Sequence, residues 1–349
     1  MKSTILLSFL LVCPAGSCHE RQHTANGDVQ STQFSNSTLL NTYENGYKVY
    51  LNESNDRNIE AVIRDGLQAY NNLKDGDDTW DHCTVTITSA GGEIIAGATG
   101  DICKNEKTVD TCFLDTLWVH EDHRHRGLGT KVMQALSQHV SSKGCKIIQL
   151  HAYEYQDHAK DFFEKLGFKT TATVPTPDTL AGFAMYIMRK SLIDNDLSPV
   201  TDETDYQVHI ETSWNETNSK IIVDRLNAYN ALHVHAQADN PYTIFLVSDS
   251  SEIIGGAFGH ICILNGNAYC DLSALWVHEK YRQHKLGTKL MNELVQYAHN
   301  KKCQLIQLET FEWQARGFYE KLGFILVATV PNIENCHGKE QYYMRKKLQ

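Results

Sequence analysis

Proline, positive charge and long apolar runs are all scarce in this chain of 349 residues. Six prolines and 22 glycines are too few for a fibrous or low-complexity protein. The 32 lysines and arginines are outnumbered by 42 aspartates and glutamates, and the resulting net charge of −10 opposes binding to the phosphate backbone of nucleic acid. We therefore expect no nucleic-acid partner.

Apolar residues, by contrast, are plentiful. Hydrophobic side chains make up 42% of the chain and aromatic side chains 9%, which is enough to build buried cores and excludes global disorder. At roughly 150 residues per domain, the length predicts two domains.

The first 18 residues have the layout of a secretory signal peptide. Lys2 precedes an apolar run over residues 5–13 and the small residues 15–17, and this run is too short to span a bilayer. Cys18 also fits a bacterial lipoprotein box, and a cytoplasmic protein with an unprocessed leader is the alternative. No other segment could cross a membrane, so we expect no transmembrane segment. Residues 19–46 are rich in Ser, Thr, Asn and Gln, which predicts a polar tether.

The rest of the chain is a tandem repeat. At an offset of 158, residues 112–150 match residues 270–308 with 20 identities in 39 positions. Further matches include FFEKLGF (residues 162–168) with FYEKLGF (residues 318–324). Each copy has about 145 residues, which is too long for one repeat of a solenoid, so each copy should have its own core. The repeat predicts an N-terminal domain at 47–192, an acidic linker at 193–205 and a C-terminal domain at 206–349.

Each copy has an α+β pattern in mixed order. In the first copy we expect strands at 48–50, 84–88, 93–102, 113–119 and 146–152, helices at 58–73, 127–142 and 159–166, and two closing strands. Apolar residues recur at every fourth position of the helix at 127–142 and of its partner in the second copy, so one face of each helix should pack on a sheet. These residues are Leu128, Val132, Leu136 and Val140, and Leu286, Leu290, Leu294 and Ala298.

Eight cysteines lie beyond the leader. In an exported protein, Cys103 with Cys112 and Cys262 with Cys270 could form disulfides, because each pair flanks an expected hairpin turn. Cys145 and Cys303 follow the amphipathic helices and are expected to be packing residues.

The turn between the strand at 113–119 and the next helix is suited to a phosphorylated ligand. Glycines at 127 and 129 permit a tight turn, and the free N–H groups and dipole of the following helix attract anionic oxygens. Arg124 and Arg126 add positive charge. Neither a P-loop nor a dinucleotide fingerprint fits the spacing.

This pattern resembles the GNAT superfamily of acetyl-CoA-dependent N-acetyltransferases. Its Q/R-x-x-G-x-G/A signature is met by Arg124, Gly127 and Gly129, after the strand segment at 117–119 and before FFEKLGF. The resemblance covers nearly all of residues 47–349. It implies two tandem GNAT domains, each with a mixed, mostly antiparallel sheet flanked by helices. The sheets should part between the strands that end at Val119 and start at Lys146, and likewise at Val277 and Gln304.

In this family the strand backbone pairs with the pantetheine arm of acetyl-CoA, and the turn amides hold the pyrophosphate. The cofactor-binding residues that the resemblance implies in the first copy are Leu117, Trp118, Val119, Arg124, His125, Arg126, Gly127, Leu128, Gly129 and Thr130. Those in the second copy are Leu275, Val277, Arg282, Lys285, Leu286, Gly287 and Thr288.

The two copies differ in the residues that the resemblance makes catalytic. Tyr319 of the second copy stands where a tyrosine commonly protonates the departing thiolate, and Phe163 stands there in the first copy. Glu309 is the candidate base in the second copy, and Asp115 is a weaker candidate in the first. Lys285 replaces the first glycine of the signature, which costs on the order of 1 kcal/mol if the position requires positive φ.

The expected activity is therefore acetyl transfer from acetyl-CoA to a primary amine through a ternary complex. The acceptor could be a small polyamine-like molecule, an antibiotic, a peptide or a protein lysine. The alternative is a non-catalytic acyl-CoA-binding or protein-interaction scaffold, with one or both domains inactive. Because acetyl-CoA is an intracellular metabolite, an exported protein would meet it only inside another cell.

A metal site is not expected. His120, His123 and His125 lie within six residues, but the second copy has Tyr281 and Gln283 at two of the three places. A ligand set that is absent from the sister copy is a poor candidate.

Overall fold

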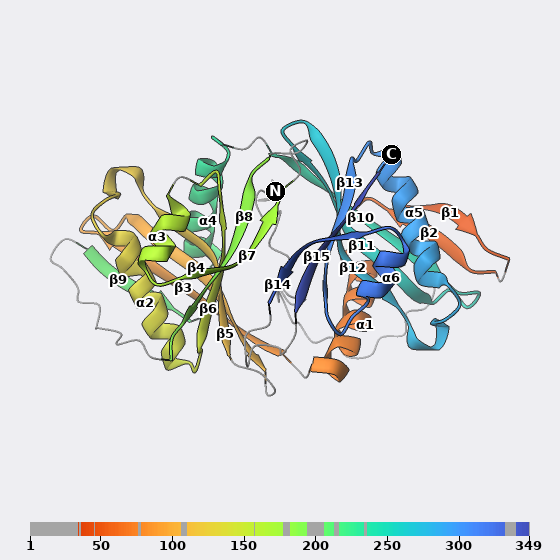
Figure 1. The fold of residues 1–349 in the computed structure, drawn as a ribbon, viewed down its shortest axis with the longest axis horizontal. Coiled ribbons are helices and arrows are strands. Elements are labelled where there is room, and N and C mark those ends of the chain that lie inside the picture. Colours follow the sequence, from red (N-terminus) through yellow and green to blue (C-terminus); the bar gives the residue numbers. More distant parts are fainter. Residues whose placement is uncertain are drawn as a thin grey trace. The chain divides into compact units, whose positions relative to one another are not determined.

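The chain forms two compact units, each built on one mixed sheet (Figure 1). The computed structural model describes residues 34–348 except 35, 45, 76–77, 106–109, 157, 177–181, 194–205, 213–215, 234–235 and 332–339. The N-terminal unit contains residues from 75 to 235 and from 328 to 340, and the C-terminal unit contains the remaining described residues. The leader at 1–18 and most of the linker at 193–205 lie outside the described residues.

The N-terminal unit has a seven-stranded sheet in the order β7-β8-β6-β5-β4-β3-β9, in which β5 and β6 are parallel and all other neighbours antiparallel. Its strands are β3 (Asp78–Ser89), β4 (Ile94–Asn105), β5 (Thr111–Val119), β6 (Ile147–Tyr153), β7 (Lys169–Pro175), β8 (Ala184–Ser191) and β9 (Tyr206–Glu211). Its helices are α2 (Leu128–Ser142), α3 (Ala159–Lys165) and α4 (Glu216–Asn230), with a 3-10 turn at Glu121–His123.

The C-terminal unit has an eight-stranded sheet in the order β1-β2-β10-β11-β12-β13-β15-β14, with β12 and β13 parallel. Its strands are β1 (Ser37–Thr42), β2 (Lys48–Asn52), β10 (Ala236–Val247), β11 (Ile253–Leu264), β12 (Asn267–Val277), β13 (Leu305–Phe311), β14 (Ile325–Val330) and β15 (Gln341–Lys347). Its helices are α1 (Arg57–Asp75), α5 (Leu286–Asn300) and α6 (Arg316–Lys321), with a 3-10 turn at Glu279–Tyr281. The predicted fold class is confirmed.

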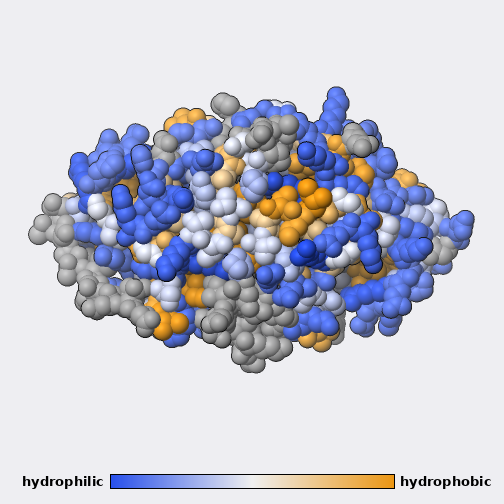
Figure 2. All heavy atoms as spheres, viewed as in Figure 1, coloured by the Kyte–Doolittle hydropathy of each residue, from blue (hydrophilic) through white to orange (hydrophobic). Residues whose placement is uncertain are grey.

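The apolar faces of α2 and α5 form the centres of the two cores. All eight residues predicted for these faces are at most 2% exposed. Most of the face shown in Figure 2 is hydrophilic, as expected when apolar side chains are gathered inside. Each helix therefore packs on its sheet, as the four-residue spacing predicted.

The first strand and helix of each repeat belong to the sheet of the other repeat. β2 pairs with β10, whereas β3 pairs with β9. In Figure 1 the orange α1 accordingly lies among the blue elements of the C-terminal unit, and the green α4 lies in the N-terminal unit. The sequence boundaries at 47–192 and 206–349 had assigned each strand–helix segment to the copy that follows it in the chain. Because the two segments are equivalent in the repeat, sequence similarity does not show whether each segment pairs with its own copy or with the other copy.

Each exchanged helix inserts an isoleucine over a glycine of its new sheet. Ile63 of α1 lies over Gly256 of β11, and Ile222 of α4 lies over Gly97 of β4, so closely that a Cβ on either glycine would be 2.3 or 2.5 Å from the isoleucine Cδ1 atom. Both isoleucines are fully buried. The two glycines are therefore required for close approach of helix and sheet.

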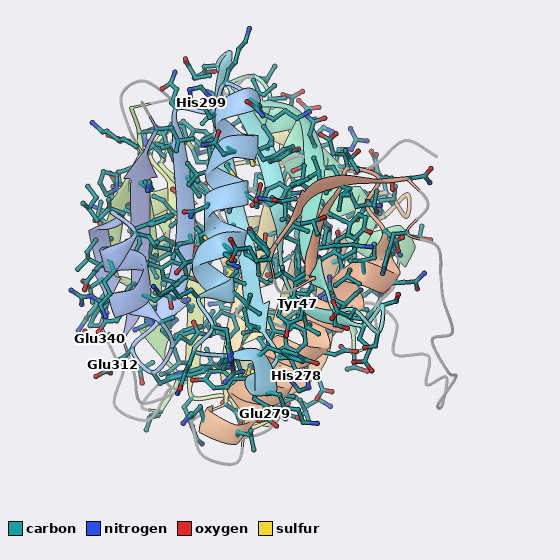
Figure 3. All side chains as sticks on the ribbon, turned by 90° about the vertical axis from the view of Figure 1, so that its right-hand side faces the viewer. Tyr47, His278, Glu279, His299, Glu312 and Glu340 are labelled. Carbon is teal, nitrogen blue, oxygen red and sulfur yellow. The ribbon has the colours of Figure 1, made fainter. Side chains whose placement is uncertain are left out.

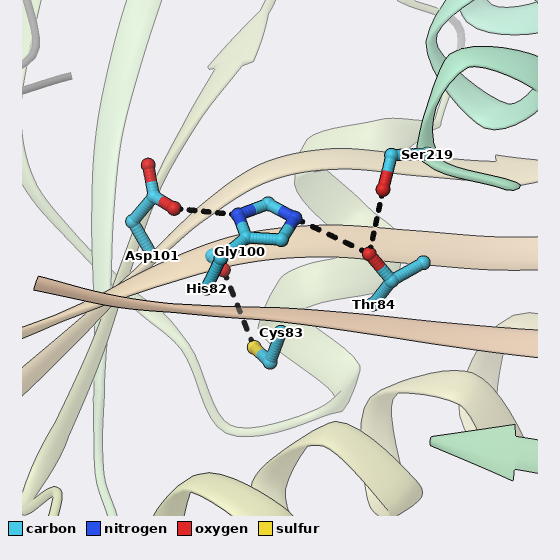
Figure 4. A network of polar contacts seen from close by, with 6 residues as sticks. All are labelled: His82, Cys83, Thr84, Gly100, Asp101 and Ser219. Atoms are coloured by element: carbon cyan, nitrogen blue, oxygen red, sulfur yellow. Dashed lines mark hydrogen bonds and ion pairs between the residues drawn. The ribbon is translucent and has the colours of Figure 1, made fainter. Parts of the chain in front are cut away.

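Polar groups also fasten α4 to its sheet (Figure 4). The Thr84 hydroxyl of β3 lies 2.8 Å from the Ser219 hydroxyl of α4, and both residues are fully buried. His82 Nε2 lies 3.2 Å from the same Thr84 oxygen, and His82 Nδ1 lies 2.7 Å from Asp101 Oδ1. The network satisfies buried polar groups that would otherwise destabilise the contact.

The structure differs from the sequence-based expectations at part of the tether and at the possible hairpin disulfides. The expected tether at 19–46 contains β1, which pairs antiparallel with β2 although its sequence is polar. The hairpin disulfides do not form, because Cys112 pairs with Ile102 and Cys270 pairs with Ile261. Cys103 and Cys262 are each one residue further along their strands, so they point to the opposite face. The seven described cysteines are buried and form no disulfide with one another, and the burial of Cys145 and Cys303 agrees with the prediction.

Substituting Gly66 by Ala is expected to destabilise the C-terminal unit, although alanine normally favours a helix by about 1 kcal/mol. A Cβ at Gly66 would lie 2.2 Å from the Trp276 ring, and such overpacking costs about 1–3 kcal/mol. Urea unfolding would measure the loss. The matched control is Gly317→Ala in α6, where the added methyl meets nothing within 4 Å and should stabilise by about 0.5–1 kcal/mol. Equal stabilisation by both changes would contradict the close packing of α1.

Candidate functional site

In both units the two parallel strands part at the same point. β5 and β6 are paired from Thr111 to Leu114, and β12 and β13 are paired from Cys270 to Leu272. Beyond these residues the facing backbone groups of β5 and β12 have no partner strand on that side. The predicted openings are confirmed, and each can receive an extended ligand along the free strand edge.

A β-bulge accompanies each opening. Leu114 and Thr116 pair with the consecutive residues Gly100 and Thr99, so Asp115 is the extra residue of β5. Ser273 is the corresponding extra residue of β12. Bulges redirect side chains beside functional sites. Burial, followed by the charge of Asp101, raises the pKa of Asp115 well above its usual range.

The turns that follow β5 and β12 lead directly into α2 and α5. Gly127 (φ 79°) and Lys285 (φ 57°) immediately precede the helices, and neither makes a side-chain capping hydrogen bond. His125 and Gln283 also have positive φ. Figure 3 shows the C-terminal unit with His278 and Glu279 before the start of α5 and His299 near its end. Because neither helix is capped by a side chain, the N–H groups of its first turn are available to an anion. These turns include Gly129 and Thr130 of α2, and Gly287 and Thr288 of α5.

The signature arginines are held at the base of each turn. Arg124 Nε donates to the Val119 carbonyl at 3.2 Å, and Arg282 Nε donates to the Val277 carbonyl at 2.9 Å. Their contribution to phosphate binding stays a prediction, and these two hydrogen bonds hold the turns. His125, Arg126 and Lys285 are exposed, so they are accessible to a ligand.

Other predicted cofactor residues could contact a ligand mainly through their backbone, because their side chains are buried or packed against a core. The side chains of Leu128 and Leu286 are buried in the cores, which leaves only their amides for a ligand. Leu117 and Val119 pack against the N-terminal core, and Trp118 is 7% exposed. Leu275 and Val277 line a cavity in the C-terminal unit.

This cavity has a volume of about 300 Å³ and lies at the opening between β12 and β13. Both predicted catalytic residues, Glu309 and Tyr319, line it. Its opposite wall comes from Leu67, Tyr70 and Asn71 of the exchanged helix α1. Sequence reasoning missed these three residues, because nothing in the repeat indicates that α1 joins the second sheet.

Glu309 has a carboxylate that is poorly satisfied by the protein. Gln341 Nε2 donates to Oε2, while Oε1 is buried without a hydrogen-bond partner. Burial, followed by the charge of Asp271, raises the pKa of Glu309 well above its usual range, and polar contacts with Tyr343 and Gln341 oppose the shift. A raised pKa makes a carboxylate a stronger base once it is ionised.

Tyr319 is 7% exposed, and burial raises the pKa of its phenol. It therefore remains protonated and able to donate at neutral pH. Phe163 occupies the same environment in the N-terminal unit: its ring lies 5.5 Å from Phe168, and the Tyr319 ring lies 5.7 Å from Phe324. The phenolic hydroxyl is thus the main difference between the two positions. His151 is the first residue of β6 beyond its pairing with β5, and Glu309 is the first residue of β13 beyond its pairing with β12. The N-terminal unit therefore has a histidine at the position of Glu309.

His120 and His278 cap the 3-10 turns that follow β5 and β12. His120 Nδ1 accepts a hydrogen bond from the Asp122 amide, and His278 Nδ1 accepts one from the Lys280 amide in the other repeat. Among the residues that the structure describes, no group of three His, Cys, Asp or Glu could hold a metal ion.

A sequence profile of the acetyltransferase (GNAT) family matches residues 50–168 and 205–324. The chain belongs to this family. A relative from Streptomyces morookaense, described as blasticidin-S acetyltransferase, is 29% identical over 92 residues, which cover 26% of this chain and 65% of the relative. The chain thus spans less than two thirds of that relative's length.

Solved acetyltransferase structures resemble parts of this GNAT chain. One from Bacillus cereus ATCC 14579 is 23% identical with a TM-score of 0.34, covering 40% of this chain and 95% of its own. A putative acetyltransferase from Agrobacterium tumefaciens is 20% identical with a TM-score of 0.33, covering 39% of this chain and 93% of its own. In the described part of this chain, no helix is long and apolar enough to cross a membrane.

The variant Lys285→Gly is expected to be more stable but to bind coenzyme A less tightly. Glycine relieves about 1 kcal/mol of left-handed strain at φ 57°. Loss of the ammonium group beside the helix N-terminus should weaken coenzyme A binding about three- to tenfold. Thermal unfolding and calorimetry would measure the two effects. The reciprocal change Gly127→Lys should destabilise the N-terminal unit, and no change in stability for either variant would contradict the strain argument.

Proposed function

We propose that the C-terminal unit transfers an acetyl group from acetyl-CoA to a primary amine in a ternary complex. The observation that carries the proposal is that Glu309 and Tyr319 line one cavity where the parallel strands part. Membership of the GNAT family supports acyl-CoA as the co-substrate. The free edge of β12 and the first turn of α5 fit its pantetheine and pyrophosphate parts.

Acetyl-CoA would supply the thioester carbonyl that the amine attacks. The cationic amine first releases one proton to solvent, which frees the nitrogen lone pair. Glu309 Oε1 then removes a second proton as the C–N bond forms, and the Tyr319 hydroxyl donates a proton to the sulfur as the C–S bond breaks. Both side chains then return to their starting state by exchanging one proton with solvent.

The acceptor is a cationic primary amine: a polyamine-like molecule, an antibiotic, a peptide or a protein lysine. The relative described as blasticidin-S acetyltransferase supports a small-molecule acceptor. The net charge of −10 favours encounter with cations. Release of thiol from acetyl-CoA with a panel of polyamines, aminoglycosides and lysine peptides tests the proposal. Coenzyme A binding without transfer to any acceptor would support a non-catalytic scaffold instead.

For the N-terminal unit we propose acyl-CoA binding with weaker or no transfer. Phe163 cannot donate a proton, and the carboxylate of Asp115 is its remaining candidate base. Export directed by residues 1–18 is a further proposal, which mass spectrometry of the mature N-terminus would test.

The variant Glu309→Gln is expected to lower kcat about 10²-fold or more and to change the pH profile. Glu309 must be ionised to act as a base. Because its pKa is raised, the acidic limb of the wild-type pH profile should lie at a higher pH than for an ordinary glutamate. Activity should therefore be lost as pH falls through this raised pKa, and the limb should disappear in the variant. The pH dependence of kcat would show this. Persistence of the same limb in Glu309→Gln would assign it to another group.

A further inference from the structure

The end of α1 bridges the two sides of the opening between β12 and β13. The Tyr70 ring centroid lies 4.6 Å from the Arg282 guanidinium, which belongs to the turn after β12. The adjacent Asn71 accepts a hydrogen bond on Oδ1 from Gln314 Nε2, at 3.3 Å, from the segment after β13. Two consecutive residues of the first repeat thus contact both edges of the opening in the second.

The N-terminal unit repeats this arrangement with the exchanged helix α4. The Arg124 guanidinium lies 5.0 Å from the Tyr229 ring centroid, and Gln156 Nε2 donates to Asn230 Oδ1 at 3.3 Å. The contact was therefore retained in both copies, each time between residues of different repeats. Such a recurrence is not expected of an incidental surface contact.

Gln314 links Asn71 to the strand that carries Glu309. The Gln314 Oε1 atom accepts hydrogen bonds from the Phe311 amide at 3.0 Å and from the Thr310 hydroxyl at 3.1 Å, at the end of β13. Asn71 is only 9% exposed. Asn71 is therefore connected through Gln314 to the end of β13, beside Glu309.

The cavity between these residues has the chemistry of a site for a compact cation. Phe311 provides aromatic surface and the buried Oε1 atom of Glu309 accepts no hydrogen bond, whereas the Tyr70 ring already faces the Arg282 guanidinium at the cavity wall. An ammonium group supplies a donor to this Oε1 atom, and aromatic faces attract its charge. A volume of about 300 Å³ limits the group that can follow the amine.

We propose that Tyr70 and Asn71, supplied by the first repeat, form the acceptor-selecting wall of the second repeat's site and select compact cationic primary amines. This inference rests on the proposed function of the same site. Tyr70 and Asn71 act as positioning and specificity residues, whereas Glu309 and Tyr319 act on the reacting atoms. The second site is consequently completed by the first half of the chain.

The test uses the full chain and its variants Asn71→Ala and Tyr70→Leu, with Leu73→Ala as the control because Leu73 is 78% exposed on the same helix. We expect Asn71→Ala to raise the KM for a short diamine at least tenfold while coenzyme A affinity stays within twofold. Tyr70→Leu should reduce the preference for the short diamine over a bulky aminoglycoside about five- to tenfold. Asn71→Asp, which keeps the accepting oxygen, should restore most of the acceptor affinity.

Calorimetric titration of the diamine into protein loaded with coenzyme A separates this inference from the proposed function. Weaker diamine binding by both variants supports the wall even if no acetyl transfer is found, which would overturn only the proposed activity. Unchanged diamine affinity and KM in folded Asn71→Ala and Tyr70→Leu, checked by thermal unfolding, would overturn the wall. Equal losses in Leu73→Ala would overturn it as well.

Discussion

Replacement of Tyr319 by Phe is expected to lower kcat about 10²- to 10³-fold with little change in the KM for acetyl-CoA. The loss of one positioned proton donor typically costs this much, and the hydroxyl acts on the sulfur only as the C–S bond breaks. The ring itself should remain in place, because Phe163 already occupies the equivalent environment in the other unit. Steady-state kinetics with a saturating amine would measure the effect.

The matched control is Phe163→Tyr in the N-terminal unit. This change adds the hydroxyl to the unit that lacks it, so any transfer by the double variant Tyr319→Phe, Phe163→Tyr above that of Tyr319→Phe alone would report on the N-terminal unit. Thermal unfolding should be nearly unchanged for Tyr319→Phe. Wild-type kcat in a folded Tyr319→Phe variant would exclude the phenol as the acid and direct attention to a water molecule.

A chain consisting of residues 206–349 alone is expected to be strongly destabilised, although it contains a complete sequence repeat, because its own β9 and α4 would have to take the places of β2 and α1. It lacks β2 and α1, so β10 loses its neighbouring strand and Phe245, Val247 and Trp276 lose the apolar cover of Ile59 and Ile63. Uncovering these three large side chains costs about 1.5–3 kcal/mol each, and the sum is comparable to the usual stability of a domain. Circular dichroism and urea unfolding would measure the outcome.

The rearranged chain that joins residues 34–75 directly to residues 236–349 is the appropriate control. It restores the eight-stranded sheet from one covalent piece and should unfold cooperatively. A cooperative transition for 206–349 with no such transition for the rearranged chain would contradict the exchange of strand and helix between repeats.

The elements around the cofactor turn could be predicted because their sequence patterns are local and strong. The apolar residues of α2 and α5 recur at helical spacing, and the left-handed conformation at Gly127 and Lys285 follows from the signature. Glu309 and Tyr319 were found through the family resemblance, and the structure places both in one cavity.

The remaining features depend on tertiary pairing that no local pattern contains. β2 and β9 are equivalent strands, so their exchange leaves the hydrophobic pattern unchanged. The bulge at Asp115 and the offset between Cys103 and Cys112 each depend on a one-residue shift in the pairing of β4 with β5. Such a register is determined by contacts between strands and not by the sequence of one strand. The contribution of Tyr70 to the C-terminal cavity follows from the exchange and was missed for the same reason.

The crossed arrangement of the two halves also constrains how such a protein can evolve. A gene that lost the first half would lose the strand and helix that complete the second sheet, even if the first half no longer performed any chemistry of its own. Selection must therefore preserve both halves together. A substitution at Phe163 can therefore alter the first half's own core, while β2 and α1 of the same half remain necessary for the second sheet.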